Sequence, residues 1–165
     1  HVIFPGYRTT NLIVALGCAG LIAIAVFYFQ DHLGLEPCYL CITQRVFVMG
    51  AGVICAVAAL HNPSPQGQRA YAGLLVVSAF TGGYFSIKQL LLQNLPEDKV
   101  PACGPPVDYL FEAFSATDAI SMLLRGDGNC AEVQWQLLSL SMPAWVLIAF
   151  ILLAAIGLMQ FFRKA

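Results

Sequence analysis

The sequence predicts an all-α membrane protein, a bundle of four transmembrane helices with two loops on one side of the membrane, the second of them long. Two observations predict this fold class. Hydrophobic residues make up 59% of the 165 residues and charged residues only 10%, whereas soluble domains are about one quarter charged. In addition, four stretches without charged residues approach or exceed the roughly 18 residues that a spanning helix needs. We expect residues 1–165 to form a single domain.

The four transmembrane segments are expected at about 11–29, 40–60, 70–90 and 143–162. The loops are then expected at about 30–39 and 93–142. Because the number of spans is even, both chain ends lie on the side opposite to these loops. Between the second and third segments, the stretch from Leu60 to Arg69 contains Pro and Gly, which break helices, so a short turn is expected there.

Lysine and arginine are split evenly between the two sides of the predicted bundle. Four lie on the side of the chain ends (Arg8, Arg69, Arg163, Lys164) and four on the side of the loops (Arg45, Lys88, Lys99, Arg125). The positive-inside rule counts these residues and therefore gives a tie. Arg45 and Lys88 lie at helix ends, where snorkelling or a specific role explains them. We therefore expect cytoplasmic chain ends, with the loops, which carry all nine acidic residues, on the other side.

Four of the six cysteines share the loop side of the membrane. They are Cys38, Cys41, Cys103 and Cys130. Such an arrangement suits an oxidising compartment outside the cytoplasm, which agrees with the expected orientation. Cys18 and Cys55 fall inside the first two segments, and we interpret them as small apolar core residues.

The stretch EPCYLCITQR carries the most specific chemical signal. Pro37 suits the start of a helix, so Cys38 and Cys41 fall in its first turns, where unpaired N–H groups and the helix dipole favour a thiolate. Arg45 follows Cys41 by one turn and lies on the same helix face. Its guanidinium stays charged, so it can stabilise a thiolate or an anionic ligand. The competing interpretation of Arg45 is a snorkelling anchor.

Other classes of function account for less of the sequence. The net charge of −1 provides no basic surface for nucleic acid. A zinc site made of all four loop-side cysteines is disfavoured, because structural zinc sites usually bring two closely spaced pairs, and Cys103 and Cys130 are far apart; we expect no metal. A structural disulfide between these two would contribute roughly 3 to 4 kcal/mol, yet it leaves the CxxC unexplained. A metal-binding or structural membrane protein with a non-catalytic disulfide remains the alternative.

Together these motifs resemble the DsbB family of bacterial inner-membrane disulfide-generating proteins. The resemblance covers nearly the whole chain: EPCYLCITQR, VPACGPPVDYL around Cys103, GDGNCAEVQW around Cys130, and LSMPAWVL entering the last segment. The order of the cysteines argues against relatives of vitamin K epoxide reductase, in which the CxxC follows the loop pair instead of preceding it.

The resemblance implies a quinone-dependent thiol oxidoreductase in the bacterial inner membrane, with cytoplasmic termini and periplasmic cysteines. A reduced DsbA-like periplasmic thioredoxin-fold protein would attack at Cys103 and release Cys130. Cys130 would then attack Cys38, and Cys41 would become a thiolate against a bound ubiquinone or menaquinone, with Arg45 beside that quinone. Catalysis is thus expected at the four loop-side cysteines, and cofactor binding at Arg45 and Cys41.

The long second loop contains one further apolar stretch, residues 109–124 (YLFEAFSATDAISMLL). We expect a short helix on the membrane surface here, although Glu112 and Asp118 interrupt its apolar face. Trp135 and Trp145 are expected as interfacial anchors.

Lys88 and Gln89 end the third segment on the same side of the membrane as the cysteines. They could border a quinone pocket, but the sequence assigns neither of them a role.

Overall fold

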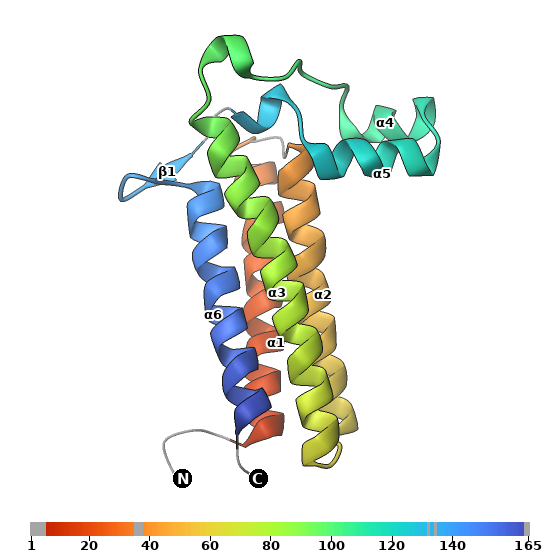
Figure 1. Cartoon of the computed structure of the whole chain (residues 1–165), viewed down its shortest axis with the longest axis vertical. Helices are drawn as coiled ribbons and strands as arrows, with labels where there is room; N and C mark the ends of the chain where they lie inside the picture. The colour runs from red at the N-terminus through yellow and green to blue at the C-terminus, as the bar shows by residue number, and fades with distance from the viewer. Residues whose placement is uncertain (1–5, 35–37, 132, 134, 164–165) are drawn as a thin grey trace.

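The computed structural model describes residues 6–34, 38–131, 133 and 135–163. Four long helices run up and down through the molecule, and both chain ends lie at the same end of the bundle (Figure 1). The spans are α1 (Tyr7–Ala23) with its π-helical continuation η1 (Ile24–His32), α2 (Tyr39–His61), α3 (Pro65–Gln93) and α6 (Met142–Phe162). The predicted class, an all-α membrane protein with four spanning helices, is confirmed.

The turn between α2 and α3 is shorter than the sequence predicted. Pro65, expected to break the chain between the helices, instead begins α3, because the first position of a helix needs no N–H donor. Asn62 ends α2 in the left-handed conformation with φ of 44°, which asparagine tolerates better than most residues. The helix start expected at Pro37 lies outside the described residues.

Small residues let the helices approach closely. Gly82 on α3 packs against the Phe150 ring of α6, and a Cβ on Gly157 of α6 would lie 2.6 Å from Val76 of α3. Contacts between α1 and α2 and between α2 and α3 complete the bundle. In a lipid environment such close packing holds helices together, since apolar surface gains little by leaving lipid.

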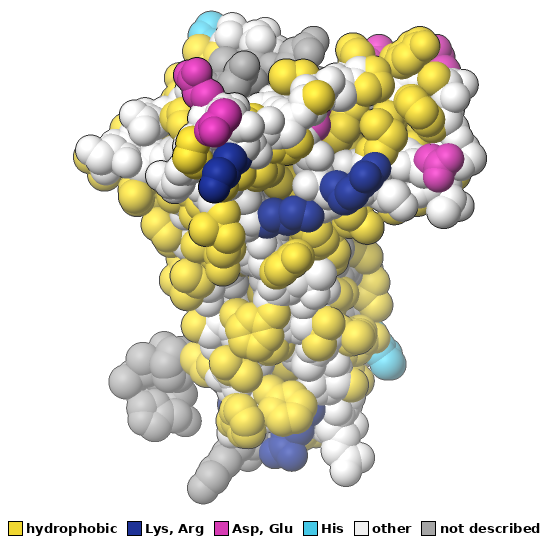
Figure 2. Space-filling view, turned by 45° about the horizontal axis from the view of Figure 1, so that its top comes forward, with side chains coloured by type: hydrophobic (Ala, Val, Ile, Leu, Met, Phe, Trp, Pro, Cys, Tyr) yellow, Lys and Arg dark blue, Asp and Glu magenta, His cyan; other side chains and the backbone are white. Residues whose placement is uncertain are grey.

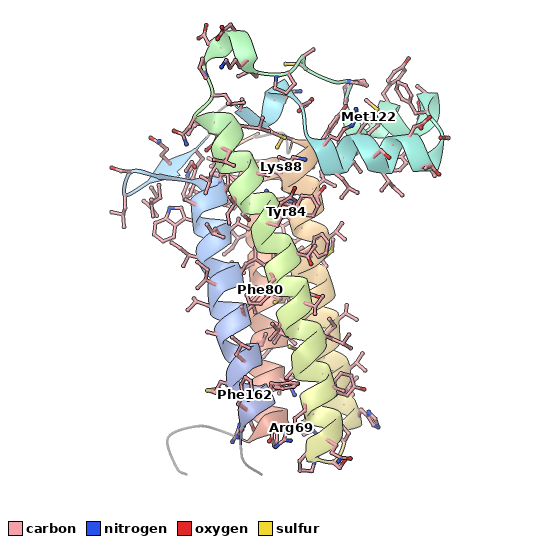
Figure 3. The ribbon with its side chains drawn as sticks, viewed as in Figure 1. Arg69, Phe80, Tyr84, Lys88, Met122 and Phe162 are labelled. Atoms are coloured by element: carbon pink, nitrogen blue, oxygen red, sulfur yellow. The ribbon has the colours of Figure 1, made fainter. Side chains whose placement is uncertain are left out.

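The outer faces of the helices carry large exposed apolar side chains, as a lipid-facing surface requires. Phe80 and Tyr84 project outward from α3, Lys88 lies further along the same helix beside α5, and Arg69 lies at the opposite end (Figure 3). In a space-filling view, apolar side chains cover the shaft, acidic side chains lie at the end that carries the loops, and basic side chains lie toward both ends (Figure 2).

The second loop contains two short helices where the sequence predicted one. They are α4 (Val107–Ala113) and α5 (Ala116–Arg125), and they project sideways from the bundle as an arm (Figure 1). The break falls at Ser115, whose hydroxyl accepts a hydrogen bond from the N–H of Asp118 at 3.3 Å and so caps α5. Asp118, one of the two acidic residues that interrupt the apolar pattern, therefore belongs to the first turn of a new helix. Contact of the arm with a membrane surface stays a prediction.

Two side chains of the bundle hold the arm at its base. Thr43 Oγ1 donates to the carbonyl of Leu123 at 3.0 Å, and Lys88 Nζ donates to the carbonyl of Leu124 at 3.0 Å. These two carbonyls lie in the last turn of α5, where carbonyls have no hydrogen-bond donor within the helix. Thr43 and Lys88 therefore supply the missing donors at the C-terminus of α5.

A small hairpin leads the chain back into the last span. Its strands β1 (Gln136–Leu137) and β2 (Leu140–Ser141) pair antiparallel. Leu138 and Ser139 between them have φ of 55° and 67°, the left-handed pair found in type I′ turns. Two short 3₁₀ turns, η2 (Glu97–Lys99) and η3 (Gly128–Ala131), complete the described elements.

Candidate active site

The first turn of α2 presents the CxxC pair at the end of the bundle that carries the loops. Cys38 is the N-cap of the helix, and its Sγ accepts a hydrogen bond from the N–H of Cys41 at 3.4 Å. The two sulfurs lie 3.3 Å apart. The sequence expectation of a dithiol exposed to the N-terminal field of a helix is therefore matched by the geometry.

Two segments of the second loop are joined around Cys103 and Cys130. Gly128 N–H donates to the Ala102 carbonyl at 3.2 Å, and Asp127 Oδ2 accepts from the N–H of Gly104 at 2.7 Å. A Cβ on Gly128 would lie 3.1 Å from Cys103 Sγ, so the sulfur lies directly against this backbone. Cys103 itself is exposed to solvent.

Cys130 follows Gly128 by two residues and lies next to the CxxC. It is fully buried, and its Sγ accepts a hydrogen bond from the N–H of Leu40 at 3.3 Å. The pKa of Cys38 is raised above its ordinary value. The largest cause is a hydrogen bond with Cys130, followed by a hydrogen bond with Cys41 and by burial. The sulfur of Cys130 thus lies next to the CxxC at the mouth of α2, and hydrogen bonds join its segment to that of the exposed Cys103.

Tyr39 links the start of α2 to the segment that contains Cys103. Its hydroxyl donates to the carbonyl of Pro105, two residues after Cys103, while the Tyr39 ring is buried at the start of α2. The contact joins the segment of Cys103 to the start of α2 across a separation of 66 positions in the chain.

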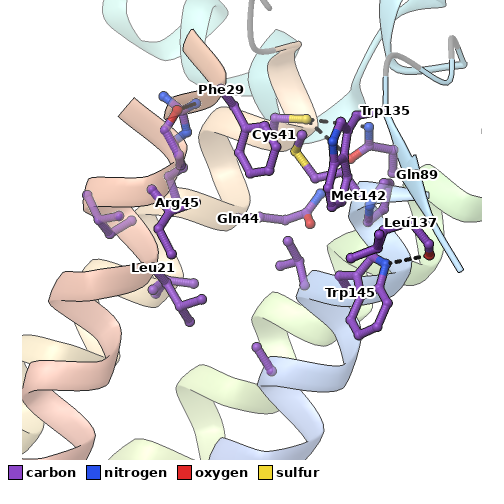
Figure 4. A pocket seen from close by; sticks show the side chains of 17 residues that line it. Leu21, Phe29, Cys41, Gln44, Arg45, Gln89, Trp135, Leu137, Met142 and Trp145 are labelled. Carbon is purple, nitrogen blue, oxygen red and sulfur yellow. Dashed lines mark hydrogen bonds between the residues drawn. The ribbon is translucent and has the colours of Figure 1, made fainter. Parts of the chain in front are cut away.

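An apolar cavity of about 300 Å³ begins at Cys41 and extends between η1, α2 and α6 (Figure 4). Arg45 and Leu21 line one side and Trp135 and Trp145 the other, with Cys41 between them. Among the lining residues, Arg45 alone carries a charge. The cavity therefore combines apolar walls, one fixed positive charge and one reactive sulfur.

Arg45 is anchored on the first span. Its Nη1 donates to Gln30 Oε1 at 2.8 Å and its Nη2 to the Ala25 carbonyl at 3.4 Å. Both partners belong to η1, where the π-helical winding changes which carbonyls are free for other donors. The guanidinium is thus held at the cavity wall, on the helix that also carries Cys41. Its stabilisation of the Cys41 thiolate stays a prediction.

The two tryptophans have a different place from the one expected. Both line the cavity, so the interpretation as simple interfacial anchors was incomplete. The hairpin folds this segment back over the bundle: Trp145 Nε1 donates to the Leu137 carbonyl at 3.1 Å, and the Trp135 ring meets Phe29 edge-on at 4.8 Å. Sequence alone does not reveal this fold-back.

The remaining cysteines lie away from the site. Cys18 and Cys55 are buried in the apolar core between α1 and α2, in the setting that we predicted. Within the described part of the chain, no group of three or more His, Cys, Asp or Glu side chains is arranged to hold a metal ion.

Sequence reasoning left several site residues without a role. Gln44, Ser86 and Gln89 are buried beside the CxxC, and Asp127 joins the two cysteine segments. The signal that could have found the first three is their polarity inside apolar spans, where an unpaired polar group is costly. No comparable signal marks Asp127.

The comparisons with known proteins agree with this geometry. A family model described as "Disulfide bond formation protein DsbB" matches residues 7–160. The chain belongs to the DsbB family. Membership together with the four spans makes it a multi-pass membrane protein of disulfide bond formation, a disulfide-generating oxidoreductase.

Relatives in the DsbB family match the chain over most of its length. Disulfide bond formation protein B of Saccharophagus degradans is 50% identical over 161 residues, which cover 98% of this chain and 96% of the relative. The protein of the same name from Marinobacter nauticus is 47% identical over 152 residues, covering 92% and 90%. Disulfide bond formation protein B 1 of Pseudomonas aeruginosa is 36% identical over 158 residues, covering 96% of each chain.

Proposed function

We propose that the protein reoxidises a DsbA-like periplasmic thioredoxin-fold protein and passes the electrons to a membrane quinone, ubiquinone or menaquinone. The observation that supports this most is the arrangement of the four cysteines. The segment of the exposed Cys103 is hydrogen-bonded to the segment of the buried Cys130, Cys130 lies next to Cys38 and Cys41, and an apolar cavity begins at Cys41. Such an arrangement links a water-soluble thiol donor to a lipid-soluble acceptor.

The thiol steps follow from the order of these contacts. A thiolate of the reduced partner attacks Cys103 of a Cys103–Cys130 disulfide, so that a mixed disulfide forms and Cys130 leaves as a thiolate. Cys130 then attacks Cys38 of the Cys38–Cys41 disulfide, a Cys38–Cys130 bond forms, and Cys41 leaves as a thiolate at the cavity. The partner's second thiolate attacks the mixed disulfide, releasing oxidised partner and a Cys103 thiolate. Exchange of this kind needs accessible sulfurs that can reach one another.

The cavity residues suit a quinone. Aromatic and aliphatic side chains would hold the ring and tail, while Arg45 and Gln44 would hold its oxygens with Cys41 alongside. When bound, a quinone supplies a two-electron, two-proton acceptor at this position. Arg45 keeps its charge at any physiological pH, so it favours a thiolate at Cys41 and negative charge on a bound oxygen.

This function requires the loops to face the periplasm of the bacterial inner membrane, with cytoplasmic chain ends. Supporting this orientation, the acidic residues of the described chain gather at the end of the bundle that carries the loops (Figure 2), and the start of α1 and the end of α6 lie together at the other end (Figure 1). Free exchange with a quinone pool also requires a lipid bilayer around the cavity.

The decisive experiment is anaerobic. Purified protein in detergent receives a reduced DsbA-like partner and either ubiquinone or menaquinone, and the quinone absorbance and the partner thiols are followed together. We expect one quinone to be reduced for each pair of partner thiols oxidised. Cys41→Ser and Cys103→Ser should abolish this coupling, whereas Cys55→Ser, a matched change of a buried cysteine outside the site, should retain it.

Two results would argue against the proposal. Oxidation of the partner without quinone reduction would separate the thiol chemistry from the cavity. Absence of both reactions with a competent partner would favour a structural membrane protein with a non-catalytic disulfide, or, if metal co-purifies in stoichiometric amount, a metal-binding one.

A further inference from the structure

Three buried polar side chains form a chain of hydrogen bonds that ends on the sulfurs of the CxxC. Ser86 Oγ donates to Gln44 Oε1 at 2.9 Å, and Gln44 Nε2 donates to Gln89 Oε1 at 2.7 Å. Gln89 Nε2 lies 3.5 Å from Cys38 Sγ and 3.4 Å from Cys41 Sγ. Ser86 is 0% exposed and the two glutamines 3% each, so the chain is closed to bulk solvent.

In the structure, the amino group of Gln89 faces both sulfurs. The hydroxyl of Ser86 donates to the oxygen of Gln44, so the amino group of Gln44 points at Gln89. The oxygen of Gln89 is thereby engaged, and its amino group faces the two cysteines. An amide turned the other way would present its oxygen to the sulfurs and repel a thiolate.

The amide of Gln89 can also form a hydrogen bond with Cys41 in either of its protonation states. A Cys41 thiol can donate to Gln89 Oε1, 3.6 Å away, and a Cys41 thiolate can accept from Gln89 Nε2. A neutral amide does this without the desolvation cost of a buried charge. Arg45, by contrast, directs its hydrogen bonds at Gln30 and Ala25 on the first span.

We propose that Gln89 is a further catalytic residue of this enzyme, and that Gln44 and Ser86 are positioning residues that hold its amide with the amino group toward Cys38 and Cys41. Hydrogen bonds from this amino group favour the reduced sulfurs over the disulfide. The proposal rests on the proposed function in one respect, that Cys38 and Cys41 are the redox pair.

The test is the equilibrium of the Cys38–Cys41 pair with glutathione, measured on the full-length protein in detergent without quinone or partner. Two glutathione thiols become glutathione disulfide, and the pair gains two electrons and two protons to become two thiols. Alkylation followed by peptide mass analysis gives the reduced fraction at each glutathione ratio. The variants are Gln89→Leu, Ser86→Ala and Ser86→Thr, with Gln68→Leu as control.

Gln68 is a close match for Gln89. It lies on the same helix α3, is equally buried at 3% exposed, and forms amide hydrogen bonds with Asn11 and Asn62 at the opposite end of the bundle. The same substitution there imposes the same loss of a buried amide but leaves the sulfurs untouched.

We expect Gln89→Leu to shift the equilibrium constant by up to about tenfold toward the disulfide, the upper end of the usual loss for one hydrogen bond, which for a two-electron couple is about 30 mV. Ser86→Ala should shift it in the same direction by a smaller factor, and Ser86→Thr, which keeps the hydroxyl, should restore it. Gln68→Leu should leave the constant unchanged.

An equilibrium constant for Gln89→Leu equal to that of the wild type would overturn the proposal, and so would an equal shift in Gln68→Leu. If Gln89→Leu fails to fold, Ser86→Ala carries the test, since it removes a single hydroxyl: an unchanged constant there overturns the orienting role. A wild-type pair that does not exchange with glutathione at all would instead contradict the proposed function.

Discussion

Cys38 lies between Cys130 and Cys41, and its hydrogen bonds with these two sulfurs raise its pKa. The thiolate is the reactive form of cysteine. In the reduced protein at pH 7, we therefore expect iodoacetamide to alkylate Cys38 at least about tenfold more slowly than the exposed Cys103. The rate at Cys38 should rise as the pH increases through the alkaline range. Timed alkylation with peptide mass analysis measures both rates, and similar rates at pH 7 would show that Cys38 is not restrained by its neighbours.

Under the proposed function, we expect Arg45 to act at the cavity and not at Cys103. We expect Arg45→Ala to slow quinone reduction by about a hundredfold, the usual loss for one preorganised charged donor, while the mixed disulfide at Cys103 still forms. Stopped-flow quinone absorbance and non-reducing gels measure the two steps. Gln30→Leu removes only the hydrogen-bond partner of Arg45 Nη1, so it should slow quinone reduction much less. Loss of the mixed disulfide in Arg45→Ala would mean that the residue acts elsewhere.

Asp127 holds the two cysteine segments of the second loop together through one oxygen. Its Oδ2 accepts from the N–H of Gly104 and from Asn129 Nδ2, while its buried Oδ1 has no hydrogen-bond partner among the described residues. Removing this acceptor leaves the N–H of Gly104 unpaired, at a cost of roughly 1 to 3 kcal/mol. We expect Asp127→Ala to displace Cys103 from Cys130 and slow their disulfide formation. Asp127→Asn, which keeps an acceptor oxygen, should retain more of that rate, and the reverse ranking would contradict this role.

At the scale of elements, the hairpin β1–β2 decides the shape of the cavity. It carries the chain from Trp135 back to α6, and the Leu137 carbonyl receives the Trp145 indole hydrogen bond. Its turn uses two residues, Leu138 and Ser139, that are poorly suited to positive φ.

The double variant Leu138→Asn with Ser139→Gly gives this turn the sequence that type I′ geometry favours. We expect it to stabilise the protein by about 1 kcal/mol, because neither side chain lines the cavity and the strain of the turn is relieved. Thermal unfolding in detergent measures the gain, and quinone reduction should keep its wild-type rate. A lower unfolding temperature would show that the Leu138 side chain contributes contacts of its own.

At the scale of the whole molecule, orientation follows from the position of the loops relative to the chain ends. We expect Cys103 to react with a membrane-impermeant maleimide in intact cells after mild reduction. A cysteine introduced by Ser64→Cys, in the turn between α2 and α3, should react only after the membrane is opened. Labelling is read by gel shift, and the opposite pattern would invert the proposed topology.

The sequence by itself determined the number of spans, their approximate limits and the gathering of four cysteines on one side. These properties are local: a long run without charge has to cross the bilayer as a helix, because lipid offers no partner to backbone groups. The spacing of Cys38, Cys41 and Arg45 is local as well, since helix geometry alone places them on neighbouring turns.

Only the tertiary structure decided what surrounds those cysteines. Gln89 reaches the CxxC from 48 positions away, and Cys130 meets the N–H of Leu40 from 90 positions away. The cavity exists because η1, α2, the hairpin and α6 converge on Cys41. Contacts of this kind depend on how helices pack and loops fold back, and no periodicity or motif encodes them. For that reason the sequence predicted the candidate cysteines, whereas the side chains around them emerged only from the packed bundle.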